Sequence, residues 1–267
     1  MKISKSKMLI AILIWGLSLA GGLSLFAGDF PAGPEGQSPN RGQSLRTPAE
    51  ATGDLEYTQN EAIAAFLSAL DALSPELAVR VVGRTLPTDE YAARDIYLAV
   101  LSEKPAASPE ALDRTKPTVL FTAAQHGNEQ SAKEAALWLL RDLALGDLRP
   151  LLKQVNVLVM PQTNPYGNFM NIRANELGLD MNRDHVKLEA EGVRAIHCVF
   201  RAWMPEVTID VHEKGDDYYR VSIGCVSNIN IGRDLQDFSR KVILAEVEKS
   251  MRKKNIPFYE YLVTEDL

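Results

Sequence analysis

The sequence predicts an α/β domain built in layers around a largely parallel or mixed sheet. Short runs rich in valine, isoleucine and leucine alternate with longer segments whose apolar residues recur at helical spacing. In addition, 46% of the 267 residues are hydrophobic and 24% are charged, which is typical of a globular chain with one sizeable core. Strands that alternate with helices are the pattern of a layered α/β domain.

Residues 1–28 are predicted to be a signal peptide or an N-terminal anchor. Three lysines in the first seven residues precede an apolar run and then small residues, as in a cleavable signal. Extended to Ala27, the run is roughly 20 residues long, enough for an uncleaved membrane anchor. Residues 29–54, rich in proline, glycine and serine, are expected to be a flexible linker. The expected location is secreted or periplasmic, or membrane-anchored and facing outward.

The folded domain is expected to span residues 55–267 and to begin with a helix. Thr58 and Glu61 match a capping box, and apolar residues follow at helical spacing. Further helices are predicted over residues 129–145, ending at Gly146, and over 188–203 and 232–253. The predicted strands are residues 78–82, 96–101, 118–123, 155–160, 207–211 and 219–223.

Charge and cysteine content exclude two classes of protein. The net charge is -6 and the pI is near 5.4, and no segment has the density of basic residues that binding to a phosphate backbone requires. We therefore expect no nucleic acid partner. Cys198 and Cys225 are too few for a disulfide framework, although the sequence allows either one bridge or two separate thiols.

Two clusters of potential metal ligands follow predicted strands. His126 and Glu129 form an HxxE motif just after the strand over residues 118–123, and His212 directly follows the strand over 207–211. Two histidines and one carboxylate are a typical ligand set of catalytic zinc, with a fourth position left for water or substrate. Because catalytic groups gather beyond the carboxyl ends of strands, the order of elements permits both ligand groups on one rim of the sheet, where they would hold one Zn²⁺ per chain. The sequence alone does not establish that the two strands are neighbours.

The residues between these clusters carry a family resemblance. Asn-Pro-Tyr-Gly stands at 164–167, Arg173 follows, and Asp-Met-Asn-Arg stands at 180–183. The ordered series resembles the M14-type zinc metallocarboxypeptidases, in motif detail over residues 126–213 and more loosely from residue 55. The resemblance implies a three-layer domain with a mixed central sheet flanked by helices. It also implies a hydrolase that cleaves the C-terminal peptide bond of peptides through a zinc-activated water.

The resemblance also assigns roles to individual residues. The three candidate ligands match the zinc ligands of the family. Asp180 matches the acid that accepts the second ring N–H of the first ligand histidine and thereby orients it. Asn182 and Arg183 match the pair that holds the C-terminal carboxylate of the substrate. Arg173 matches the arginine that polarises the scissile carbonyl, although the loop before Asp180 also allows a shifted alignment.

The chain departs from the family pattern after His212. In the family, a glutamate well downstream of the third ligand is the general base, and only 55 residues, 213–267, follow His212. No general base is found in the chain, and the domain is expected to lack its C-terminal part. Glu213 adjoins His212, but neighbours along a strand point to opposite faces, so a structural role is expected.

These departures leave two alternatives to a carboxypeptidase. One is a zinc amidase or deacylase that acts on cell-wall peptides or N-acyl amino acids. The other is a catalytically impaired fragment that binds zinc or peptide. In each case the expected partner is a peptide or acyl-amino-acid with a free carboxylate, and membrane contact is expected only through an uncleaved N-terminal segment.

Overall fold

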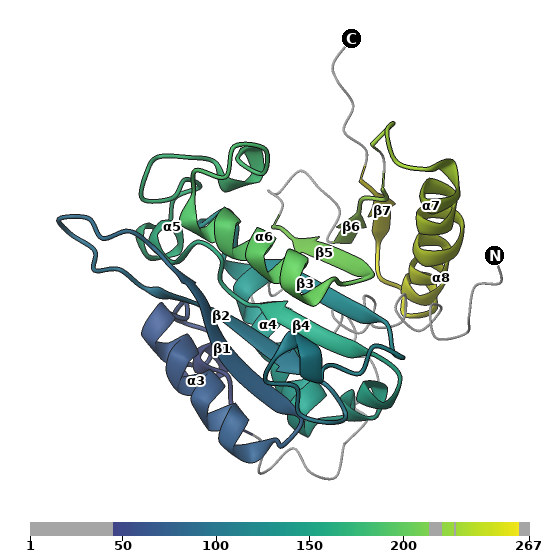
Figure 1. The fold of residues 1–267 in the computed structure, drawn as a ribbon, viewed down its shortest axis with the longest axis horizontal. Helices are drawn as coiled ribbons and strands as arrows, with labels where there is room; N and C mark the ends of the chain where they lie inside the picture. The colour runs from purple at the N-terminus through teal and green to yellow at the C-terminus, as the bar shows by residue number, and fades with distance from the viewer. Residues whose placement is uncertain (1–44, 214–220, 227, 262–267) are drawn as a thin grey trace. The chain divides into compact units, whose positions relative to one another are not determined.

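A computed structural model of the chain describes residues 45–213, 221–226 and 228–261 (Figure 1). The contacts divide the described residues into two compact units, a larger one over residues 45–213 and a smaller one within residues 221–261. The predicted signal or anchor, residues 1–28, lies outside the described residues. Among the described helices, none combines the length and apolar character needed to span a bilayer.

The larger unit contains a mixed five-stranded sheet. Its order is β1-β2-β4-β3-β5; β1 pairs antiparallel with β2, β2 antiparallel with β4, and β3 parallel with both β4 and β5. Every residue of β3 and β4 is buried, as expected for strands covered on both faces. The strands are β1 (Leu77–Arg84), β2 (Asp95–Leu101), β3 (Thr118–Ala123), β4 (Asn156–Met160) and β5 (Val207–Val211).

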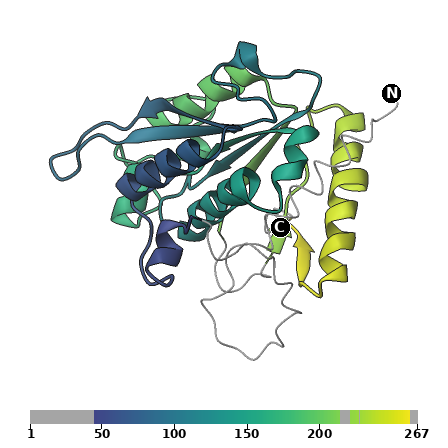
Figure 2. The same ribbon diagram turned by 90° about the horizontal axis from the view of Figure 1, so that it is seen from below.

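Helices cover both faces of this sheet. Helices α3 and α4 lie on one face and α6 on the other, as the two perpendicular views show (Figures 1 and 2). The predicted three-layer α/β fold with a mixed central sheet is therefore confirmed. The helices of this unit are α2 (Pro48–Ala51), α3 (Asn60–Leu73), α4 (Gln130–Leu145), α5 (Pro165–Met170) and α6 (Glu191–Trp203), with 3-10 turns η1 (Pro109–Ala111), η2 (Arg149–Lys153) and η3 (Met181–Arg183).

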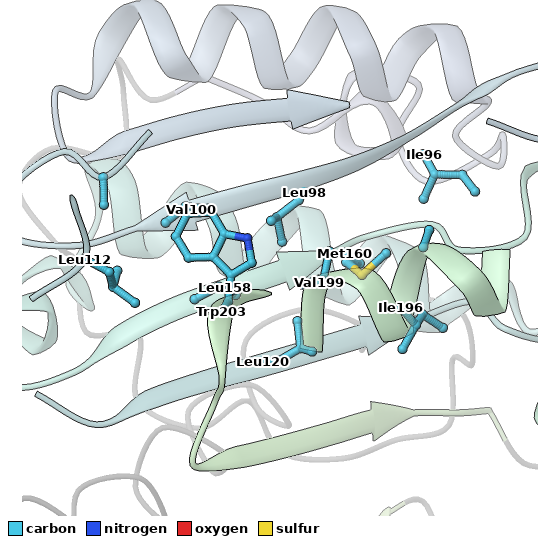
Figure 3. Packing of buried hydrophobic residues seen from close by; sticks show 12 residues of the cluster. Ile96, Leu98, Val100, Leu112, Leu120, Leu158, Met160, Ile196, Val199 and Trp203 are labelled. Atoms are coloured by element: carbon cyan, nitrogen blue, oxygen red, sulfur yellow. The ribbon is translucent and has the colours of Figure 1, made fainter. Parts of the chain in front are cut away.

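The core between the sheet and α6 follows from the two periodicities of the sequence. Alternate residues of β2, including Leu98 and Val100, point toward α6, and residues of α6 spaced by three and four, including Val199 and Trp203, point back (Figure 3). Trp203 is only 3% exposed. Burying a large apolar side chain contributes about 1.5–3 kcal/mol, so this packing fixes α6 on the sheet.

The folded region begins earlier than the sequence predicts. Helix α2 lies within the expected linker over residues 29–54, and Thr47 and Glu50 form a reciprocal capping box at its start. Glu50 also accepts hydrogen bonds from Trp138 and Arg141 of α4. The expected linker is therefore ordered at its C-terminal end, because a short polar segment finds partners about 90 residues away in the chain.

The predicted capping box at Thr58 is wrong. Helix α3 starts at Asn60, and its N-cap residue makes no side-chain capping hydrogen bond. Both the backbone N–H and the hydroxyl of Thr58 donate instead to the carboxylate of Glu134 on α4, at 2.9 and 2.7 Å. Thr58 therefore bonds to Glu134 on another helix and not to the start of α3.

The smaller unit contains a two-stranded parallel sheet and one helical stretch. Strand β6 (Val221–Ile223) pairs with β7 (Phe258–Glu260). The helix predicted over residues 232–253 is present as α7 (Arg233–Phe238), a π-helical turn η4 (Ser239–Leu244) and α8 (Ala245–Lys253). Of the strand predicted over 219–223, the first two residues lie outside the described residues. Cys198 and Cys225 are both free thiols.

Candidate functional site

Three potential metal ligands converge at one rim of the sheet. His126 lies in the loop after β3, Glu129 immediately precedes α4, and His212 directly follows β5. Because β3 and β5 are parallel neighbours in which Ala123 pairs with Val211, their carboxyl ends deliver both histidines to one place. One ligand atom from each of the three residues lies within 4.8 Å of the other two.

The three side chains offer the donor set of a zinc site. The Nδ1 atom of His126 lies 2.6 Å from one oxygen of Glu129, and the Nδ1 atom of His212 lies 2.7 Å from the other. Both rings thus turn the same nitrogen toward one carboxylate, and their centroids are 4.7 Å apart. Two imidazole nitrogens and one carboxylate oxygen form the donor set that catalytic zinc uses.

Electrostatics hold this cluster together. Burial alone would raise the pKa of Glu129, but hydrogen bonds from His126 and His212 lower it to about 2. Burial alone would lower the pKa of His212, but Asp210 and Glu129 raise it to about 10. An ionised Glu129 beside a protonated His212 is therefore favoured, and a metal ion bound here would release the His212 proton.

Asp180 lies behind His126. Its Oδ1 atom is 3.1 Å from the Nε2 atom of His126, and its Oδ2 atom accepts from the Nε atom of Arg173 at 2.9 Å. It also accepts from the backbone N–H of Asn182 at 2.9 Å. Burial opposes ionisation of Asp180, but Arg173 keeps its pKa below the ordinary value. An ionised Asp180 can hold a proton on His126 Nε2 and leave Nδ1 for a metal ion.

The remaining site residues predicted from the sequence line the front of the cluster. An Nη1 atom of Arg173 lies 3.2 Å from His126 Nδ1 and 3.8 Å from Glu129 Oε1, and its side chain is 48% exposed. The side-chain amide of Asn182 lies 3.2 Å from His212 Nε2. The exposed guanidinium of Arg183 donates to the Asn182 carbonyl at 3.0 Å. The structure thus brings Arg173 and Asn182 to the ligands and places Arg183 at the surface beside them.

Sequence reasoning missed Asp210. Its Oδ2 atom lies 2.7 Å from the Nε2 atom of His212, on the side of the ring away from Glu129. The signal was present, because residues two apart on a strand share a face and Asp210 stands two before His212. Glu213 was expected to be structural. Its carboxylate accepts hydrogen bonds from the backbone N–H and the hydroxyl of Ser131 at the start of α4.

Sequence reasoning also missed a buried polar cluster beside the loop between His126 and Glu129, which we call the ligand loop. We call the cluster itself the rear cluster; its members are Asn60, Gln130, Lys133, Gln162 and Asn168. Lys133 is fully buried, and its ammonium donates to Thr58 O at 2.6 Å and to the side chains of Gln130 and Asn168 at 2.8 Å each. Burial lowers the pKa of Lys133. A lysine inside an apolar helical face was the available signal.

The rear cluster holds the ligand loop by its backbone. The side-chain amides of Asn168 and Gln130 donate to the carbonyl of Gly127, at 3.0 and 3.2 Å. Gly127 also packs directly on Gly167 of α5, since a Cβ added to Gly127 would lie 1.9 Å from the Gly167 carbonyl carbon. The Gly127 N–H donates to the Arg173 carbonyl at 3.4 Å. The loop between His126 and Glu129 is thereby fixed from two sides.

Asn164, in the Asn-Pro-Tyr-Gly motif, is a helix cap. Its side chain accepts from the Gly167 N–H at 2.9 Å and donates to the Gln125 carbonyl at 3.0 Å. Pro165 follows as the first residue of α5, a position where a missing N–H costs nothing. The motif therefore joins the start of α5 to the residue just before His126.

The fold and the candidate ligand cluster point to one family of hydrolases, which comparison with known proteins identifies. The zinc carboxypeptidase model, Peptidase_M14, matches residues 63–201, more than half of the chain. The protein belongs to the zinc carboxypeptidase family. Its M14 resemblance is thus confirmed at the level of the family.

Curated relatives include fungal carboxypeptidases. The chain is 29% identical to Carboxypeptidase 2 of Trichophyton tonsurans over 151 residues, which cover 52% of this chain and 28% of that protein. It is 28% identical to Carboxypeptidase 2 of Trichophyton rubrum over 180 residues, which cover 62% of this chain and 33% of that protein. The chain thus spans about a third or less of the length of these relatives.

Solved structures show the same fold. A metallo-carboxypeptidase from Burkholderia cenocepacia superposes with a TM-score of 0.59 at 26% identity, covering 76% of this chain and 53% of that one. Carboxypeptidase A from Helicoverpa armigera superposes with a TM-score of 0.60 at 15% identity, covering 77% and 57%, and supports the fold alone. The chain spans about half the length of these structures.

Proposed function

We propose that this chain is the zinc-binding part of a metallocarboxypeptidase that hydrolyses the C-terminal peptide bond of peptides. The observation that carries the proposal is the convergence of His126, Glu129 and His212, with Asp180 behind the first histidine. These three residues would hold one Zn²⁺. When bound, zinc supplies Lewis acidity that polarises a carbonyl and lowers the pKa of water toward about 7.

The surrounding residues have roles that their positions support. Arg173 lies beside His126 and Glu129 and can stabilise negative charge that develops on the substrate carbonyl oxygen. Asn182 and Arg183 are adjacent on η3, and a guanidinium with a neighbouring amide can bind a terminal carboxylate through charge-assisted hydrogen bonds. Together they would place the last peptide bond of a substrate over the metal ligands.

We assign the general base to none of the residues that the structure describes. Among them, the carboxylates in contact with the two histidines are Glu129, Asp180 and Asp210, and each already accepts a hydrogen bond from one of the histidines or from both. We therefore propose that the described residues supply zinc binding and recognition of the substrate carboxylate.

The proposal extends to location and domain organisation. Residues 1–28 would direct the chain out of the cytoplasm as a cleaved signal or an outward-facing anchor. The carboxypeptidase-like domain would then lie in the periplasm or outside the cell.

Zinc binding and carboxylate recognition test this function separately. The purified 267-residue chain is expected to bind one zinc per chain, measured by competition with a fluorescent chelator. It should also bind a peptide with a free C-terminal carboxylate more tightly than the same peptide with a C-terminal amide. No zinc binding, or equal binding of both peptides, would contradict the proposal.

Hydrolysis assays separate the carboxypeptidase from its alternatives. Release of the last residue from peptides, muropeptides and N-acyl amino acids is measured with and without chelator. Preferred cleavage of muropeptides or N-acyl amino acids would favour an amidase or deacylase, whereas binding with no turnover of any substrate would favour a binding-only protein. Peptidase activity that survives removal of zinc would refute a metal mechanism.

A further inference from the structure

A chain of side-chain hydrogen bonds runs from His212 to helix α6. The Nε2 atom of His212 lies 2.7 Å from Asp210 Oδ2, and Asp210 Oδ1 accepts from Gln125 Nε2 at 2.7 Å. Gln125 Oε1 lies 2.9 Å from His185 Nε2, and His185 Nδ1 lies 3.1 Å from Nε2 of His197 on α6. We call these five residues the His212 relay. None of its contacts involves Asp180, the carboxylate behind the other histidine.

One arrangement of protons satisfies every contact in the His212 relay. An ionised Asp210 can only accept, so His212 donates from Nε2 and Gln125 donates from its amide nitrogen. The amide oxygen of Gln125 then accepts from His185 Nε2–H, which leaves His185 Nδ1 to accept from His197. The side-chain amide of Asn182 also approaches His212 Nε2, at the longer distance of 3.2 Å. The nitrogen of His212 that remains for a metal ion is Nδ1, which faces Glu129.

Asp210 is held by more than His212. Thr122 is its register partner across the β3–β5 pair, and the Thr122 hydroxyl donates to Asp210 Oδ1 at 3.1 Å. The Asp210 carboxylate therefore has three hydrogen-bond partners, His212, Gln125 and Thr122. The Asp210 side chain is 33% exposed, so the donors around it, rather than enclosure, fix its position.

The far end of the relay fits the same proton arrangement. His185 and His197 pack with ring centroids 5.3 Å apart. Burial and the neighbouring His197 lower the pKa of His185, which favours the neutral ring that an acceptor nitrogen requires. His185 thereby fixes which way the Gln125 amide faces, and Gln125 can donate to Asp210 in only that orientation.

We propose that Asp210 is a positioning residue for the third metal ligand, and that Gln125 and His185 hold Asp210 in the orientation that directs His212 Nδ1 at the metal. This inference rests on the proposed zinc site. The site would then have one orienting carboxylate for each histidine, Asp180 for His126 and Asp210 for His212. Such partners of ligand histidines typically change metal affinity about 10–100-fold when they are removed.

The main test measures zinc affinity of the full 267-residue chain by competition with a fluorescent chelator. Asp210→Asn is expected to weaken zinc binding about 10–100-fold. Gln125→Met, which removes the amide but keeps the size of the side chain, is expected to weaken it by a smaller factor. Glu213→Gln is the matched control, because it makes the same carboxylate-to-amide change one residue after His212 at a group that contacts α4. Its zinc affinity should equal that of the unaltered chain.

A spectroscopic readout distinguishes positioning from general support of the fold. In the zinc-loaded unaltered chain, the Nε2–H proton of His212 should give a slowly exchanging NMR signal. The same signal should exchange rapidly with water in Asp210→Asn, while the Nε2–H signal of His126 persists. Should Asp210→Asn fail to fold, as judged by circular dichroism, Gln125→Met and the spectrum of the unaltered chain decide the question.

Three results would overturn the inference. Unchanged zinc affinity in both relay variants would do so while leaving the proposed function standing. An equal loss of zinc affinity in Glu213→Gln would show that the effect comes from general destabilisation of the region. A chain that binds no zinc at all would overturn the proposed function and this inference together.

Discussion

The two sides of the ligand loop differ in the burial of their polar groups. Behind it, the rear cluster is buried, and the Lys133 ammonium alone donates to three acceptors. In front of it, Arg173 is about half exposed and Arg183 is exposed, and both guanidiniums retain donors that face solvent. The rear thus resembles a protein core made of polar groups, whereas the front resembles a surface prepared for a charged ligand.

This difference separates stability from binding. A buried donor or acceptor that loses its partner costs about 1–3 kcal/mol, because no water replaces the lost bond. An exposed group that loses its partner is solvated at once and costs little. Substitutions behind the loop should therefore act on folding, those in front on ligand binding, and those of the ligands themselves on the metal.

The largest expected effect is on zinc affinity and follows from substitution of His126, at the start of the ligand loop. His126→Ala removes a nitrogen of the proposed ligand set. Loss of a ligand's hydrogen-bond partner weakens metal binding about 10–100-fold, and the loss of zinc affinity in this variant should be larger. Zinc affinity by chelator competition is the measurement, with Arg183→Ala as the variant that should keep its affinity. Equal zinc affinities in both variants would show that His126 is not a ligand.

A substitution in the rear cluster should lower stability. Lys133→Met removes the buried ammonium that donates to Thr58, Gln130 and Asn168. The Thr58 carbonyl then loses this donor, while the Gln130 and Asn168 oxygens each keep one other donor. The expected loss in free energy of unfolding is about 2–4 kcal/mol, measured by urea denaturation of the metal-free chain. The exposed Lys153→Met is the control and should stay within about 0.5 kcal/mol. A neutral Lys133→Met would mean that the rear cluster does not stabilise the loop.

A substitution at the front should leave stability unchanged and weaken substrate binding. Arg183→Ala removes a charged donor beside Asn182, and affinity for a peptide with a free C-terminal carboxylate should fall about 10–100-fold. Calorimetric titration measures the affinity, and urea denaturation should show a change within about 0.5 kcal/mol. Lys187→Ala is the matched control, since Lys187 is an exposed cation four residues further along. Equal losses in the two variants would indicate only a general attraction of anions.

The smallest expected effect depends on pH and lies at Glu50, which ties α2 to α4 behind the site. Burial would raise its pKa, but the Thr47 N–H and Arg141 keep it below the ordinary value of 4.5. Because the folded state binds this proton less tightly than the unfolded state, the stabilisation is present above pH 4.5 and disappears as the pH falls through the lowered pKa. Glu50→Gln should cost about 1 kcal/mol at pH 7 and progressively less below pH 4.5. Unfolding curves at several pH values test this, and a loss that does not vary with pH would exclude the ion pair as its source.

The parts of the fold that depend on short-range patterns could be predicted from the sequence. The bounds of β3 and β5 match their apolar runs to the residue, and those strands position His126 and His212. The start of α3 was misjudged, because Thr58 has a local capping motif but a stronger partner 76 residues away. Asp210 and Lys133 escaped for a similar reason. Their partners come from other elements, and periodicity says which face a residue occupies but not what it meets there.

The contact between Gly127 and Gly167 limits how this site can change. A single methyl group on Gly127 would stand 1.9 Å from backbone, and one on Gly167 would stand 2.3 Å from the Ala174 carbonyl oxygen. Both clashes are with main chain, so no rotamer change relieves them. Directed evolution by single substitutions should therefore find both positions closed. Redesign of the ligand loop would require exchanging it as one block with the segment that carries Arg173.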